Sequence, residues 1–521
     1  MEENNVNEIL DDINCETPFE FDKKDFIFTA LCSVGCISTV LFGLFGNVAL
    51  GFCLSTLILI FVLCVYLGKG NRIRATAISC GVLALANTFN FIATSNGSVR
   101  FFSIVEIVLL CLVLFDSLAN KEQNGGIKRI FISFASALFN IPLSIKSLFI
   151  KKNGTQNTIC KILIGVACAI PVLVIIISLL SSADLAFNGI VNIIVGGAVP
   201  TFAKTVLGLV LTAFAVSYGF TLKKAKNRDI NLPEINRIET VFVASFLSVV
   251  SLAYLLYLFS QLAYFFSAFN SILPEGYKFT VAAYARRGFF ELCAISVINL
   301  IIIVLSMLLS SKDGKIPILI KILCTFISSF TLIICVTAIS KMVLYISEFG
   351  MTILRITTSA FIVFIMIVFA AIIFRIYIQK IKVVKIALLS AAIILFILGT
   401  VNINAFAARY NYECYINETL STIDVSAMAD LGDEGVPYIV KLAEKSKSYT
   451  TKNLAKKYLK EYYTEKYFEL DNEDIKNGLT KEVLDYNKNY KSFKYFSIPK
   501  HKAYKALYEY AKNNPKGIRY Q

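Results

Sequence analysis

The chain has 521 residues, of which 56% are hydrophobic and only 17% are charged. Soluble domains carry about 45–50% apolar and about 25% charged residues, so this composition excludes an ordinary globular enzyme. The net charge of +15 does not indicate nucleic-acid binding. The basic residues lie mostly between apolar runs, where they set membrane orientation and meet anionic lipid headgroups.

The polar head, residues 1–25, contains nine carboxylates and two lysines, and we expect it to be a disordered cytoplasmic segment. Residues 26–405 alternate apolar runs with short basic loops. A run of about 20 residues matches the roughly 30 Å hydrocarbon core of a bilayer. The sequence therefore predicts an all-α, polytopic transmembrane helix bundle of about 11 spans, at 26–45, 47–68, 76–95, 100–118, 160–181, 199–221, 240–266, 288–309, 316–339, 354–378 and 384–405.

The distribution of Lys and Arg predicts the orientation. With the head inside, the inner segments hold 24 basic residues and the outer loops hold 7. This bias follows the positive-inside rule. It predicts a cell-membrane protein with a cytoplasmic N-terminus and, after an odd number of spans, an extracytoplasmic C-terminal tail.

Two segments outside the spans have helical periodicity. Near 127–150, apolar residues recur at helical spacing beside Lys128 and Arg129, which favours an amphipathic helix in the headgroup plane over a partner-docking helix. The tail, 406–521, holds 16 of the 25 tyrosines. Helix-period positions near 436–446, 450–468, 478–487 and 499–513 predict a small extracytoplasmic helical domain there.

Neither cysteine nor histidine chemistry is expected. Most of the 13 cysteines lie in or at the edge of apolar runs and behave as small hydrophobes. There is no CxxC motif, and His501 is the only histidine. We therefore expect no disulfide framework, no metal site and no cofactor.

Ionisable and polar residues at the ends of the spans are the candidate ligand-binding residues, because such groups are costly near a membrane. In the predicted topology they share the outer leaflet, whereas Glu106 and Asp116 lie off this layer. The candidates are Asp184, Gln261, Tyr264, Tyr284, Arg286, Arg287, Glu291, Glu348, Arg355, Asn404 and Arg409.

Structural interpretations of these residues stay open beside the functional one. Arg287 and Glu291 are four residues apart and can pair on one helix face, either to lock packing or to hold a phosphate or carboxylate. Gly350 interrupts ISEFGMTILR, either as a short loop or as a helix break lining a cavity. Asp184 fits a helix cap better than a ligand.

Several motifs resemble those of a bacterial membrane family. They include YARRGFFEL (284–292), LYISEFGMTILR (344–355), VNINAFAARYN (401–411) and TIDVSAMADLGDEGVPYIVKL (422–442). The chain resembles the families catalogued as domains of unknown function 4153 and 4173 over roughly residues 30–515. The resemblance implies many spans and an outer layer of motifs, and it implies no mechanism.

Three classes of function remain. We favour a non-catalytic envelope protein, namely a sensor, scaffold or assembly factor, with the bilayer as its partner. A transporter or lipid-handling protein that binds an anionic lipid or envelope polymer is the alternative. A membrane-embedded transferase is third, because the loop around Gly46 and Asn47 has no acid to hold a metal or act as a base.

Overall fold

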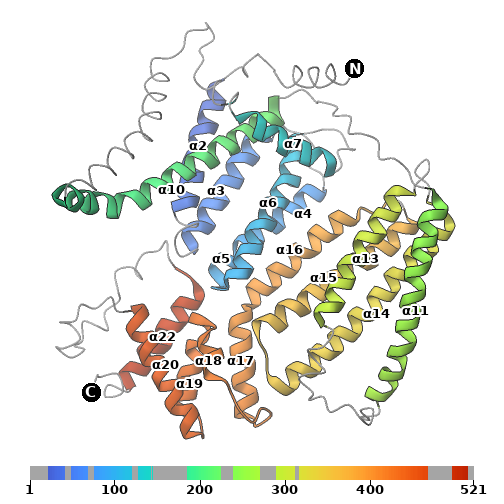
Figure 1. The fold of residues 1–521 in the computed structure, drawn as a ribbon. Coiled ribbons are helices and arrows are strands. Elements are labelled where there is room, and N and C mark those ends of the chain that lie inside the picture. The colour runs from blue at the N-terminus through green and yellow to red at the C-terminus, as the bar shows by residue number, and fades with distance from the viewer. Residues whose placement is uncertain are drawn as a thin grey trace. The chain divides into compact units, whose positions relative to one another are not determined.

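A computed structural model describes residues 22–41, 49–68, 75–119, 127–141, 144, 185–224, 239–269, 289–310, 316–378, 380–467 and 496–513. All regular structure in these residues is helical (Figure 1). Seven helices in this part are long and apolar enough to cross a membrane: Leu50–Leu67, Gly97–Ala119, Lys204–Lys223, Thr240–Leu258, Ile318–Phe349, Ile353–Tyr377 and Val383–Val401. The coarse prediction of an apolar helix bundle is confirmed.

The chain divides into two compact units. The first comprises Met1–Ile92, Ile107–Ile230 and Lys488–Ser497, and the second comprises Ala93–Glu106, Asn231–Asn487 and Ile498–Gln521. Helix α6 (Gly97–Ala119) contributes its first turns to the second unit and the remainder to the first.

In the first unit, aromatic and polar side chains connect neighbouring helices. Its other described helices are α2 (Lys23–Thr39), α3 (Leu50–Leu67), α4 (Ala75–Thr88), α5 (Asn90–Ala93, except its last residue), α7 (Ile127–Phe139) and α10 (Leu185–Lys224). Phe28 of α2 stacks on Tyr66 of α3 with ring centroids 3.7 Å apart. The Tyr66 hydroxyl donates to the buried carboxylate of Asp25, 2.8 Å away. These contacts hold the start of α2 against the end of α3.

The apolar helices of the second unit are α11 (Thr240–Phe269), α13 (Phe289–Leu309), α14 (Ile318–Phe349), α15 (Ile353–Tyr377) and α16 (Val383–Val401). An apolar core including Leu247, Ile303 and Phe369 lies between the first four of these helices. Asn299, in the middle of α13, accepts from the Tyr254 hydroxyl and donates to Thr331 Oγ1 at 2.9 Å. Such side-chain bonds join neighbouring helices where water is absent.

The second unit continues into shorter helices, drawn orange to red in Figure 1. They are α17 (Ile403–Ile416), α18 (Val425–Ala429), the 3₁₀ turn η2 (Gly432–Glu434), α19 (Val436–Lys445), α20 (Tyr449–Tyr467) and α22 (Ile498–Asn513). Their shared core includes Ala407, Met428, Leu442 and Leu507. Helices α19, α20 and α22 confirm three of the helices predicted in the tail.

Several expectations fall outside this part of the chain. The expected span at 160–181 and the tail helix at 478–487 lie outside the described residues. The expected third span, 76–95, is two helices, α4 and α5, which meet at Phe89, between Asn87 and Asn90. The predicted interfacial segment contains α7.

Candidate functional site

The structure describes the side chains of four predicted site residues: Glu348, Arg355, Asn404 and Arg409. Gln261 and Tyr264 lie in α11 and Glu291 lies in α13, but their side chains are outside the described set. Asp184, Tyr284, Arg286 and Arg287 are outside the described residues altogether. The expected convergence of the whole layer therefore stays a prediction.

Arg355 binds the end of the preceding helix. Its Nη1 donates to the carbonyl oxygens of Phe349, at 3.1 Å, and Gly350. Its guanidinium carbon lies 3.9 Å from the centre of the Tyr345 ring. A cation at a helix C-terminus meets the negative end of the helix dipole. Glu348 is exposed, and among the described side chains it forms no ion pair with Arg355.

Asn404 and Arg409 lie in the same helix but have different surroundings. Arg409 is 63% exposed and pairs with Glu413, with Nε and Oε1 2.8 Å apart. Asn404 is buried and accepts a 2.8 Å hydrogen bond from Asn96. Its own amide donates to the carbonyl oxygen of Leu431, 3.3 Å away. Of the two residues, only Asn404 belongs to a buried polar site.

Asn404 is one member of a polar cluster formed by segments far apart in the chain. We call this the α17 cluster, defined as Thr94, Ser95, Asn96, Asn402, Asn404 and Glu434. The segment between α5 and α6 supplies the first three residues, the start of α17 supplies the two asparagines, and η2 supplies the glutamate. All six residues lie in the second unit.

Two asparagines of the cluster act as helix N-caps. Asn96 Oδ1 accepts from the Val99 amide at 2.9 Å, at the start of α6. Asn402, which has a left-handed backbone with φ of 55°, accepts from Ala405 at 3.2 Å, at the start of α17. Asparagine suits both tasks because its short amide caps helices and tolerates this conformation. The Asn402 amide also donates to the Ala93 carbonyl oxygen, 2.8 Å away.

Glu434 is the acidic centre of the cluster and is only 3% exposed. Its Oε1 accepts from the Ser95 amide at 2.7 Å, and its Oε2 accepts from the Ser95 hydroxyl. Arg100, which donates to the Thr94 carbonyl oxygen at 2.7 Å, acts electrostatically on Glu434 and on the buried Asp433. The Thr94 hydroxyl also donates to Oε1, at 3.4 Å. The desolvation cost of the carboxylate is thus offset by three donors and a nearby cation.

The far end of α17 binds a second helix junction. The Met351 amide donates to Asn411 Oδ1 at 2.6 Å, and Asn411 Nδ2 donates to the Met351 carbonyl oxygen at 2.8 Å. Met351 follows Gly350, whose φ of 74° turns the chain between α14 and α15. Asn411 and Asn404 are seven residues apart and share one face of α17. The motifs that contain Gly350 and Asn411 therefore meet directly.

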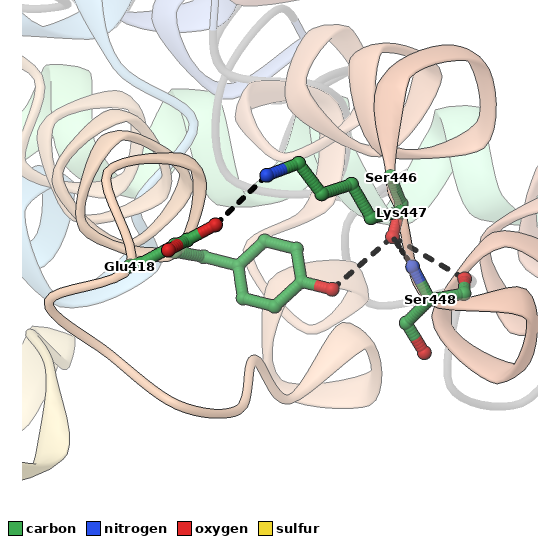
Figure 2. Close-up of polar contacts among 5 residues, drawn as sticks. Glu418, Ser446, Lys447 and Ser448 are labelled. Atoms are coloured by element: carbon green, nitrogen blue, oxygen red, sulfur yellow. Dashed lines mark hydrogen bonds and ion pairs between the residues drawn. The ribbon is translucent and has the colours of Figure 1, made fainter.

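The surface turn after α17 is held by an exposed ion pair. Figure 2 shows Lys447 reaching Glu418, with Nζ and Oε1 2.8 Å apart. Because of this contact, the pKa of Glu418 is lowered and that of Lys447 is raised. Beside it, the hydroxyls of Tyr415 and Ser446 are 3.2 Å apart. These contacts fasten the end of α17 to the segment between α19 and α20.

Sequence reasoning missed Asn96, Ser95, Glu434 and Asn411 because it ranked residues by charge at the span ends. The sequence offered three signals: the TSN segment directly before Gly97, the two adjacent acids of LGDEG (431–435), and the seven-residue spacing of Asn404 and Asn411. No group of three or more His, Cys, Asp or Glu that could hold a metal occurs among the described residues.

Helices of this length and apolar composition define a helical membrane-embedded protein. The chain belongs to the family described as Domain of unknown function (DUF4153), whose model matches residues 31–442. The family resemblance noted in the motifs is thus confirmed, and the match includes every residue of the α17 cluster. Comparisons with curated proteins and with solved structures found no match.

Proposed function

We propose that this chain is a non-catalytic multi-pass protein of the cell membrane that carries an extracytoplasmic helical part on the outer ends of its spans. Its role is that of an envelope sensor, scaffold or assembly factor. The carrying observation is that α17 binds two separate junctions, at residues 93–96 and at Met351.

The expected topology agrees with this arrangement. The Lys/Arg distribution places the segment before α6, the turn between α14 and α15, and the end of α16 on the outer side. These are the junctions that the asparagines of α17 cap or bind. A helix that collects the outer ends of several spans fixes their spacing and connects them to the helical tail.

The bonding of Glu434 also favours a structural role. A general acid or base must reach a substrate proton through a free position. Both carboxylate oxygens of Glu434 instead accept from Ser95, and the side chain is almost fully buried. The polar groups of the cluster are occupied by one another.

The test of a non-catalytic role compares Glu434→Gln with Glu413→Gln in the full-length protein, in a strain that lacks its own copy. Glutamine keeps the shape of Glu434 but removes its charge. We expect growth under envelope stress to fall only in proportion to the amount of folded protein in the membrane. The exposed Glu413 variant should match wild type in both measurements. A Glu434→Gln protein present at normal level, stable and yet inactive would assign chemistry to this carboxylate and refute the proposal.

The orientation is tested by cysteine labelling in intact cells. Thr450 and Lys380 are both exposed and lie on predicted opposite sides. In a background without native cysteines, Thr450→Cys should react with an impermeant maleimide and Lys380→Cys should react only after lysis. Protection of position 450 in intact cells would contradict both the expected topology and the outer location of the tail.

A further inference from the structure

Helix α7 is too short to cross a bilayer. Its 13 residues extend about 20 Å, compared with a hydrocarbon core of about 30 Å. Arg129 of α7 pairs with Asp116, three residues before the end of α6, with Nε and Oδ1 3.4 Å apart. Ser217 of α10 donates to the Ala137 carbonyl oxygen at 2.6 Å, and α10 ends at Lys224. Thus α7 packs against the terminal turns of two membrane helices.

The two faces of α7 differ in their surroundings. On the inner face Ala137 is fully buried, and Phe134 packs edge-on against Phe214 of α10, with ring centroids 5.2 Å apart. On the outer face Phe131 is 69% exposed and Phe139 is 77% exposed. Their eight-residue spacing places both rings on one side of the helix. An exposed aromatic face at the end of two spans fits the boundary between headgroups and acyl chains.

Two buried hydrogen-bond donors lie in α7 and near the end of α10. Arg129 Nη2 and the Tyr218 hydroxyl have no hydrogen-bond partner among the described residues. Tyr218 is only 4% exposed. Asp116 connects the two, because it pairs with Arg129 Nε and acts electrostatically on the Tyr218 phenol. Buried donors without partners are costly, so a ligand that accepts from both stabilises the site.

We infer that α7 and the end of α10 bind the phosphodiester of an anionic phospholipid in the adjacent leaflet. Arg129 Nη2 and the Tyr218 hydroxyl donate to the phosphate oxygens, and Phe131 and Phe139 contact the acyl chains. Guanidinium groups suit phosphate because their donors form a planar fork. The seven basic residues of segment 121–161 match an anionic lipid surface in charge. In the expected topology this is the cytoplasmic leaflet.

The test titrates phosphatidylglycerol into the purified full-length protein and follows its thermal unfolding temperature, with phosphatidylcholine as the neutral comparison. We expect phosphatidylglycerol to stabilise wild type more than phosphatidylcholine does. Arg129→Gln is expected to raise the half-saturating lipid concentration about fivefold, the effect of one basic residue at a lipid surface. Tyr218→Phe should weaken binding in the same direction, because it removes only the hydroxyl.

Controls separate a lipid site from an ion pair alone. Because Arg129→Gln also removes the ion pair with Asp116, the double variant Asp116→Asn/Arg129→Gln removes both charges and should still lose the lipid preference. Arg375→Gln changes an arginine in the last turn of α15 and should bind as wild type. Unchanged binding in the double variant and in Tyr218→Phe would overturn the inference. Equal stabilisation by inorganic phosphate would overturn the lipid assignment in favour of a small-anion site.

Discussion

The hydrogen bonds between Glu434 and Ser95 provide the most direct measure of what holds the α17 cluster together. Glu434→Ala removes acceptors for the Ser95 amide, 2.7 Å from Oε1, and for the Ser95 hydroxyl. Hydrogen bonds to a charged group contribute about 1.5–3 kcal/mol each, so the free energy of unfolding should fall by about 3–6 kcal/mol. Glu434→Gln keeps one acceptor oxygen and the shape of the side chain, so its free energy of unfolding should fall less.

The assay is reversible unfolding of the full-length protein in mixed micelles, by titration with a denaturing detergent. A double-mutant cycle with Ser95→Ala isolates the hydroxyl bond and should give a coupling energy of about 0.5–3 kcal/mol. Glu413→Ala is the control, because its pair with Arg409 is exposed and such pairs add little stability. Additive effects of the Glu434 and Ser95 changes, within about 0.5 kcal/mol, would show that the two side chains do not interact.

Three further predictions concern turns and caps of the second unit. Gly350→Ala should destabilise the protein more than Gly432→Ala. Both glycines have positive φ, but an added Cβ lies 2.6 Å from Asn411 Oδ1 at Gly350 and meets nothing within 4 Å at Gly432. Equal losses of unfolding free energy in the same assay would contradict this contact. Asn411→Ala removes both bonds to the turn between α14 and α15 and should cost about 2 kcal/mol; a loss too small to measure would contradict this clamp. The pKa of Asp424 is lowered, chiefly by a hydrogen bond from Ser426. Its contribution to stability is therefore present above the unfolded pKa of about 3.9 and is lost as pH falls through the lower folded pKa. Asp424→Asn should reduce this acid-dependent loss of stability, and an unchanged pH profile would refute the assignment.

Seven of the eleven predicted runs match described helices that are long and apolar enough to cross a membrane, because bilayer thickness imposes a length that one sequence reveals. The break at Gly350 was also visible, since glycine between two apolar segments interrupts a helix at little steric cost. The helices of the tail followed from their apolar periodicity. These are local properties of the chain.

The site depended on distant pairing, which one sequence does not reveal. Ser95 and Glu434 are 339 positions apart, so no spacing rule connects them. Asn404 and Arg409 were predicted together, yet five residues correspond to about 140° around a helix of 3.6 residues per turn. One is therefore buried in the cluster and the other faces solvent. Neutral asparagines make most of the hydrogen bonds of the α17 cluster, whereas the candidates chosen from the sequence were mainly charged residues.

Asn402 is the C-cap of α16 and also the N-cap of α17. A single residue therefore separates a candidate span from the helix that leads into the tail, and its side chain is tied to Ala93. Such a junction lacks the conformational freedom of a flexible linker, whose end-to-end distance grows with its length. A rotation of the tail therefore rotates or tilts α16. Conversely, a change in the tilt of α16 moves the tail. Insertion of a few glycine and serine residues at this junction would decouple the two motions while leaving each helix intact.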